Sequence, residues 1–210
     1  MTAVVTLPAG RVEFIAADRA DTAVEIRPAN PAKSRDARAA EQTTVEYADG
    51  VLRIEAPAAK GLGPSGAVEV TVRLPEGSRV EGTSDAAELR GVGRLGDVVF
   101  EGAYQQIKLD EAAAVRLSAL EGDVEIGRLT GPSEITNRRG DIRIAEATGG
   151  AVVLRTESGD ITIAAAAGVS AALDAGTGHG RVSNGLKNDG ATGLDIHATT
   201  AHGDITARSL

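Results

Sequence analysis

Four copies of one short pattern, Gly-Asp followed by alternating apolar residues, decide how this chain folds. They read Gly122-Asp123-Val124-Glu125-Ile126, Gly140-Asp141-Ile142-Arg143-Ile144, Gly159-Asp160-Ile161-Thr162-Ile163 and Gly203-Asp204-Ile205-Thr206-Ala207. The first three begin 18 and 19 residues apart, and a degenerate copy lies in the longer gap before the fourth. A nearly fixed period of this length is typical of stacked structural units.

Apolar and polar residues alternate in each copy and in the strand that precedes it. Because successive side chains of a strand point to opposite faces, we expect the apolar set to point inward. This predicts an all-β fold, a β-solenoid whose coils of about 18–23 residues stack in parallel over a thin aliphatic core. The predicted inward residues are Val98, Phe100, Ile107, Leu109, Val115, Leu117, Val124, Ile126, Ile135, Ile142, Ile144, Val152, Leu154, Ile161, Ile163, Leu173, Val182, Leu194, Ile196 and Ile205.

The first part of the chain lacks the repeat and is predicted to form a strand-rich N-terminal cap (1–79) on the solenoid (80–210). Alternation predicts several strands there, and Asp49-Gly50 predicts a tight hairpin turn. Two polar segments that contain proline are predicted as loops, the first with a turn of helix after Ser34. The predicted strands are 11–15, 23–26, 44–47, 51–55 and 67–74, and the loops are 28–42 and 57–66.

Composition excludes several classes of protein. The chain has 210 residues, a formal net charge of −8, 2% aromatic residues and no cysteine. This acidic balance argues against a general nucleic-acid binder, and the scarcity of aromatics leaves little surface for base stacking. Disulfides and thiolate metal sites are excluded. No stretch approaches about 18 consecutive apolar residues and no signal-peptide pattern is visible, so we expect a cytoplasmic protein without direct membrane insertion.

The repeats resemble a known family. Together with the strand Ala151-Val152-Val153-Leu154-Arg155-Thr156 and the lead-in Val70-Thr71-Val72-Arg73-Leu74-Pro75-Glu76-Gly77-Ser78, they resemble the bacterial β-strand-repeat "putative adhesin" family. That family is a domain of unknown function, similar in fold to the toast-rack domains of envelope-stress proteins. The resemblance covers residues 65–210 best. It implies a right-handed β-solenoid and no known catalysis.

The repeated aspartates are the first candidate site. We expect Asp123, Asp141 and Asp160 to lie one above another at one corner. Since calcium-binding β-rolls also place Gly and Asp in their turns, one hypothesis is a ladder of cation sites. Turn chemistry, in which Asp accepts hydrogen bonds from local backbone amides, is favoured because the tandem β-roll pattern is absent. Arg181 replaces aspartate in the degenerate copy, and we expect it between Asp160 and Asp204, paired with one or both.

The histidines are the second candidate. His179 and His202 both precede the glycine of a copy, so we expect them to stack on adjacent coils. Two imidazoles could begin a zinc site with help from Asp204 or Asp174, although zinc usually takes three or four protein ligands. An exposed pair is the favoured interpretation.

Enzymatic motifs are absent from the sequence. It contains no Gly-x-Ser-x-Gly elbow and no phosphate-binding loop. Arg138, Arg139, Arg143 and Arg155 come nearest to the basic groove of a polysaccharide lyase, but a solvated face of alternating charge explains them better. We assign no catalytic, cofactor-binding or metal-binding residue and expect no cofactor.

The last repeat ends at Ser209-Leu210, so we expect the final coil to be uncovered. Either the polar segment 183–190 folds over this end or a partner contacts it, since repeat proteins usually need caps. We therefore expect a non-enzymatic scaffold that binds a protein partner or self-associates through its open end. The alternatives are a ligand- or cation-binding, adhesin-like protein and, least favoured, a carbohydrate-active enzyme.

Overall fold

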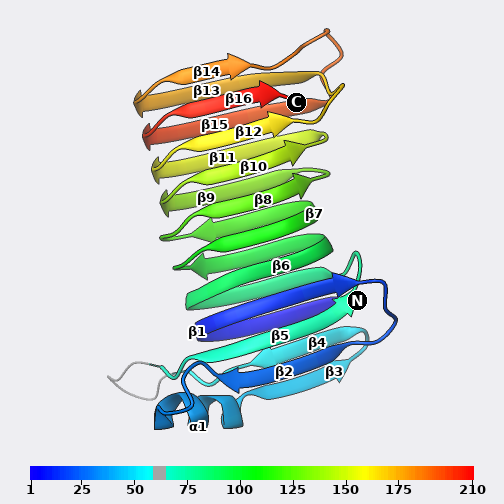
Figure 1. Ribbon diagram of the computed structural model, residues 1–210, viewed down its shortest axis with the longest axis vertical. Coiled ribbons are helices and arrows are strands. Elements are labelled where there is room, and N and C mark those ends of the chain that lie inside the picture. Colours follow the sequence, from blue (N-terminus) through cyan, green and yellow to red (C-terminus); the bar gives the residue numbers. More distant parts are fainter. Residues whose placement is uncertain (59–64) are drawn as a thin grey trace.

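A computed structural model describes residues 1–58 and 65–210, in which sixteen strands form one sheet wound into a solenoid (Figure 1). The predicted loop 57–66 therefore lies partly outside the described residues. One short helix, α1 (Ser34–Gln42), lies at the N-terminal end of the stack. The strands are β1 (Thr2–Ala17), β2 (Ala23–Pro28), β3 (Thr44–Ala48), β4 (Val51–Glu55), β5 (Val68–Pro75), β6 (Arg79–Ala103), β7 (Ile107–Ala119), β8 (Val124–Leu129), β9 (Ser133–Arg139), β10 (Ile142–Ala147), β11 (Gly150–Ser158), β12 (Ile161–Ala165), β13 (Ala171–His179), β14 (Val182–Gly185), β15 (Leu194–His202) and β16 (Ile205–Ser209).

Each turn of the chain, called a rung below, places strand residues on two faces. On the first face, Leu117 of β7, Ile135 of β9 and Leu154 of β11 align in parallel register. On the second face, the strands β8, β10 and β12 pair in the same way. Nearly all predicted inward residues are buried in one core, which confirms the solenoid prediction. Leu173 is only partly buried and Val182 is 44% exposed, because β13 and β14, which carry them, form the C-terminal end of the stack.

Glycine is required at the corner between the two faces. Gly159 has a φ of +151°, and a Cβ added there would lie 2.0 Å from the carbonyl oxygen of Gly140. Gly203 has a φ of +148° and meets Gly159 at the same distance. Neither the backbone conformation nor the distance between rungs leaves room for a side chain, so the recurrence of glycine is a packing requirement.

The C-terminal rungs do not stack in sequence order, which corrects our expectation. β15 pairs with β11 on one side and β13 on the other, and β16 lies likewise between β12 and β14. The chain therefore passes over one position, builds β13 and β14 as the end rung, and returns to fill the gap (Figure 1). The end rung is the degenerate copy, and the last repeat is an inner rung.

The N-terminal end has a related arrangement. β1 pairs in parallel with β4 and β5 on one side and with β6 on the other, so the chain also begins one rung inside the stack. β2 and β3 form the end, and they pair antiparallel to β5 and β4. The predicted hairpin is present, with Asp49 at φ 51° and Gly50 at φ 78°. The boundary between residues 79 and 80 stays a prediction, while the sheet is continuous across it.

Candidate functional site at the glycine–aspartate corner

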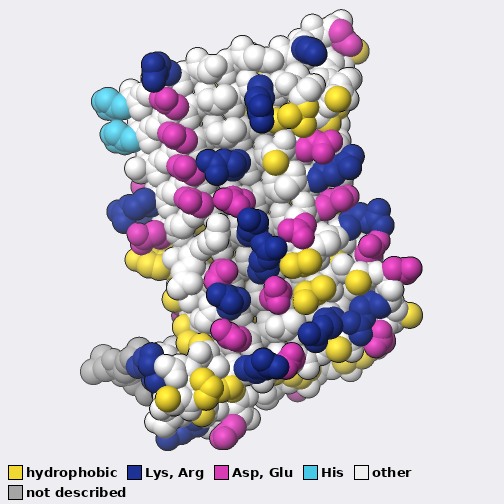
Figure 2. All heavy atoms as spheres, in the orientation of Figure 1, with side chains coloured by type: hydrophobic (Ala, Val, Ile, Leu, Met, Phe, Trp, Pro, Cys, Tyr) yellow, Lys and Arg dark blue, Asp and Glu magenta, His cyan; other side chains and the backbone are white. Residues whose placement is uncertain are grey.

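The predicted candidate residues gather along one corner of the solenoid. A column of acidic side chains follows this edge beside the two exposed histidines (Figure 2). The backbone N–H of Asp141 donates to Asp123 Oδ1 at 2.9 Å, that of Asp160 to Asp141 Oδ1 at 2.8 Å, and that of Asp204 to Asp160 Oδ1 at 2.7 Å. The predicted stacking is confirmed, but the amide that each carboxylate accepts from belongs to the neighbouring rung and not to its own turn.

These hydrogen bonds give the aspartates a structural role. A hydrogen bond that a backbone amide donates to a carboxylate is charge-assisted, and it is stronger than a hydrogen bond between neutral groups. Each such bond joins two rungs, so the ladder fixes their register along the corner. Among the described residues, no three His, Asp or Glu side chains lie close enough together to hold a metal ion.

Arg181 lies at the end of the aspartate ladder, which corrects the expectation that it sits between two aspartates. Its backbone N–H donates to Asp204 Oδ1 at 2.9 Å, and its Nη2 lies 3.8 Å from Asp204 Oδ2. It contacts one carboxylate because β14 is outside β16 in the stack. The guanidinium is 90% exposed, so the pair adds little stability.

The histidine pair is confirmed. The rings of His179 and His202 stack with centroids 4.8 Å apart and planes 1° apart. The third histidine joins the same two rungs, since Nδ1 of His197 lies 3.2 Å from Asp174 Oδ2. The Asp174 carboxylate therefore contacts His197 rather than the stacked pair His179 and His202. All three histidines contact across the boundary between the end rung and its neighbour.

A second ladder of hydrogen bonds lies at this corner and was not predicted from the sequence. Side chains three residues before each corner glycine donate hydrogen bonds to the glycine carbonyl of the neighbouring rung. The bonds are Asn137 to Gly122 at 2.8 Å, Thr156 to Gly140 at 3.2 Å, Thr200 to Gly159 at 3.0 Å and Thr177 to Gly203 at 2.9 Å. The sequence contains the pattern Thr/Asn-x-x-Gly in each of these rungs. The hydrogen bonds connect rungs that are neighbours in space, including pairs that are not consecutive in the sequence.

A groove of about 500 Å³ runs beside the corner, across the strands. Two columns of residues line it. The residues immediately before the corner glycines, and Tyr104 at the equivalent place, form one column: Tyr104, Glu121, Arg139, Ser158 and His202. The residues one position earlier form the other: Leu120, Arg138, Glu157 and Ala201.

The four arginines named from the sequence do not form one basic groove. Arg138 and Arg139 line the groove beside the corner, where Arg138 lies 3.7 Å from Glu157 and Arg139 lies 3.6 Å from Glu121. Arg143 and Arg155 lie elsewhere and pair with Glu125 and Glu134 at 3.8 and 3.3 Å.

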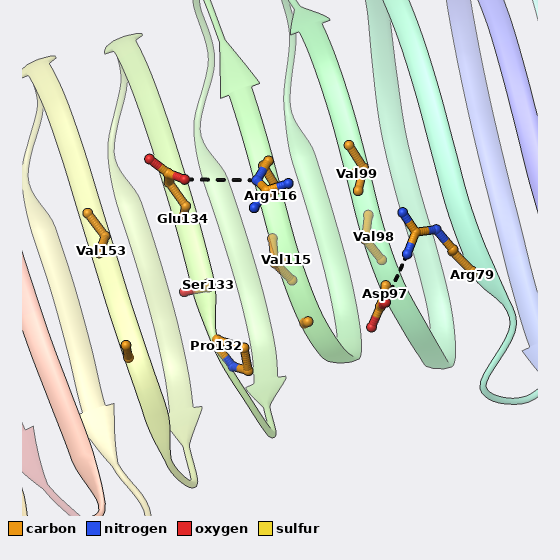
Figure 3. A pocket seen from close by; sticks show the side chains of 12 residues that line it. Arg79, Asp97, Val98, Val99, Val115, Arg116, Pro132, Ser133, Glu134 and Val153 are labelled. Carbon is orange, nitrogen blue, oxygen red and sulfur yellow. Dashed lines mark hydrogen bonds and ion pairs between the residues drawn. The ribbon is translucent and has the colours of Figure 1, made fainter.

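A second hollow, of about 350 Å³, lies on the first face (Figure 3). Its charged side chains are paired: Arg79 with Asp97 at 3.1 Å, and Arg116 with Glu134 at 3.9 Å (Figure 3). Val99 lies between the two pairs, and Val153 lies beyond Glu134 on the next strand (Figure 3). This composition is that of an ordinary sheet surface and brings no nucleophile next to a base.

Comparisons with known proteins identify a family for the chain. Residues 2–208 match the family described as Toastrack DUF4097. No curated protein matches the sequence. Similar solved structures include a "putative cell adhesion protein" from Clostridium sporogenes, 12% identical with a TM-score of 0.40, covering 100% of this chain and 92% of that chain. Another is a "putative adhesin" from Bacteroides fragilis, 12% identical with a TM-score of 0.41, covering 98% and 91%. Within the described residues, no helix has the length and hydropathy to cross a membrane.

Proposed function

The chain belongs to the Toastrack family, a domain of unknown function, and we propose that it is a non-enzymatic module that binds a protein partner through the open C-terminal end of its solenoid. The observation that carries this proposal is the distribution of exposed large apolar side chains. Among the described residues they lie at the two ends of the stack, in the corner groove and at the last residue: Val45, Tyr47, Val182, Tyr104, Leu120 and Leu210.

The outer faces offer less to a partner. Their charged side chains pair across rungs, as Lys108 does with Glu125 at 3.2 Å and Arg155 with Glu134 at 3.3 Å. Such pairs keep a face hydrated. Within residues 1–58 and 65–210, no exposed large apolar side chain, the kind of anchor that dominates protein interfaces, lies on these faces.

The C-terminal end presents unpaired sheet edges. In the described sheet, β13 pairs with β15 alone and β14 with β16 alone, so the outer N–H and C=O groups of both strands are available to a further strand. All residues of β14 are exposed. The loop that follows β14 contacts the start of β13, where Ala171 N–H donates to the Lys187 carbonyl at 3.0 Å, and the end of β16, where Lys187 N–H donates to Ser209 Oγ at 2.9 Å. Leu186 of this loop is partly buried against the core.

Light scattering after size exclusion tests the case in which the partner is a second copy. We expect the mass to rise with protein concentration in the parent and to stay monomeric in Val182→Lys, which places a charge at the end of the core. Val99→Lys, on the first face, is the control and should associate like the parent. If the parent stays monomeric up to about millimolar concentration, self-association is wrong and only a different protein partner is left.

A further inference from the structure

We propose that the groove beside the glycine–aspartate corner binds a neutral oligosaccharide that lies along the solenoid axis. This site is separate from the end of the stack, so the proposal stands or falls independently of the proposed function. Small residues line part of the groove: Ser158 lies between the long side chains of Arg139 and His202, and Ala201 ends the second column beside Glu157. The volume of about 500 Å³ falls in the range of small-molecule sites.

The charged groups in the groove form ion pairs that leave N–H donors and carboxylate oxygens able to bind hydroxyl groups. The guanidinium of Arg139 lies 3.6 Å from Glu121, and that of Arg138 lies 3.7 Å from Glu157, both beyond hydrogen-bond distance. Some arginines elsewhere on the surface are held more closely, as Arg11 is by Glu88 at 2.9 Å, and others, such as Arg143 with Glu125 at 3.8 Å, lie at similar distances. The groove therefore presents planar donors and acceptors side by side, the arrangement that fits the adjacent hydroxyls of a sugar ring.

An exposed aromatic ring lies at one end of the groove. Tyr104 is 49% exposed and Leu120 is 41% exposed, although the chain has only two tyrosines and no tryptophan. An aromatic face next to an aliphatic side chain provides a platform for the C–H face of a pyranose ring. The opposite end is formed by His202 and Ser158, which supply further hydrogen-bonding groups.

The spacing of the groove favours a saccharide over a peptide. Residues of one column repeat once per rung, roughly every 4.8 Å, and the five residues from Tyr104 to His202 span about 19 Å. An extended peptide advances about 3.4 Å per residue and alternates its side chains, so it falls out of step with the rungs. A chain of linked pyranoses repeats at a spacing close to that of the rungs and can place one ring over each.

Charge points to a neutral sugar. The two arginines of the groove are balanced by Glu121 and Glu157, so no net positive charge attracts a polyanion. The formal net charge of the whole chain is −8, which repels acidic polymers further.

Tyrosine fluorescence tests the proposal, because Tyr47→Phe leaves Tyr104 as the only tyrosine. Cellohexaose, chitohexaose and maltohexaose are titrated into this variant, with oligogalacturonate and a Ser/Thr-rich peptide as comparisons. We expect a saturable change in Tyr104 emission with at least one neutral hexaose. In this background Arg139→Gln should weaken binding about tenfold, the effect of losing one hydrogen bond to a charged group. The matched control Arg155→Gln, an arginine of the first face, should leave binding unchanged.

Calorimetry with Tyr104→Ala gives a second readout, and we expect the heat of binding to disappear while the melting temperature is kept. The proposal is overturned if no neutral hexaose binds at about millimolar concentration. It is equally overturned if only oligogalacturonate or the peptide binds, or if Arg155→Gln weakens binding as much as Arg139→Gln.

Discussion

The order of the C-terminal rungs can be tested directly with engineered cysteines. Thr162 of β12, Thr206 of β16 and Ser183 of β14 occupy equivalent places on the second face, with Thr206 paired to both others. All three carry short polar side chains and the chain has no cysteine of its own, so each pair of substitutions reports on one contact.

The structure separates the pairs by distance. Neighbouring rungs lie about 4.8 Å apart, whereas Thr162 and Ser183 are two rungs and therefore about 9.6 Å apart. A disulfide needs Cα atoms within about 7 Å. Under mild oxidation we expect a disulfide in Thr162→Cys/Thr206→Cys and in Thr206→Cys/Ser183→Cys, but not in Thr162→Cys/Ser183→Cys.

Non-reducing electrophoresis and mass spectrometry of tryptic peptides identify the bonds, with dilute protein to exclude links between molecules. Stacking in sequence order would give the reverse result for the two pairs that contain Thr162. A rapid disulfide in Thr162→Cys/Ser183→Cys, with none in Thr162→Cys/Thr206→Cys, would refute the observed order and the position of Arg181 that follows from it.

Four further substitutions test the core and the corner. Ser133→Ala should stabilise the fold by about 1 kcal/mol, since the buried Ser133 hydroxyl has no hydrogen-bond partner among the described residues; urea unfolding measures this. Asn137→Thr should raise the melting temperature by about 2–4 °C, because the Asn137 Oδ1 is buried without a described partner and threonine serves at the equivalent place in the other rungs. Gly159→Ala should cost more than about 3 kcal/mol, from the positive φ and the 2.0 Å approach to the neighbouring backbone. Arg181→Asp should lower the melting temperature, by less at high salt, since it replaces an ion pair with Asp204 by a like-charge contact.

Matched controls separate these causes from general effects of substitution. Ser118→Ala, at an exposed serine of β7, should change stability by less than about 0.5 kcal/mol. Gly168→Ala tests positive φ alone, because φ is +80° there and a Cβ would meet nothing within 4 Å; it should cost less than Gly159→Ala. Equal losses at the two glycines, or a destabilising Ser133→Ala, would contradict the packing described for the corner and the core.

The aspartate ladder and the histidine pair of the candidate site were predictable from the repeats, whereas the groove beside them was not. The positions of Asp123, Asp141, Asp160 and the stacked histidines followed from alignment of the copies. The groove did not, because its two columns come from nine residues of unlike type, and Tyr104 precedes the first Gly-Asp copy. A groove forms where small side chains lie beside large ones on neighbouring rungs. The regular spacing of a sequence motif does not report these relative sizes.

The sequence by itself determined that the chain winds into rungs and which side chains face the core, because strand alternation and corner glycines are local requirements that each copy satisfies alone. Only the tertiary structure decided the order of the rungs. In sequence order, Asn184 would be enclosed between Ile163 and Ala207, at a cost of about 1–3 kcal/mol for an unpaired amide. The gain, a second carboxylate beside Arg181, is worth about 0–1 kcal/mol at the surface. Burial therefore outweighs the ion pair, and the least apolar copy becomes the end of the stack.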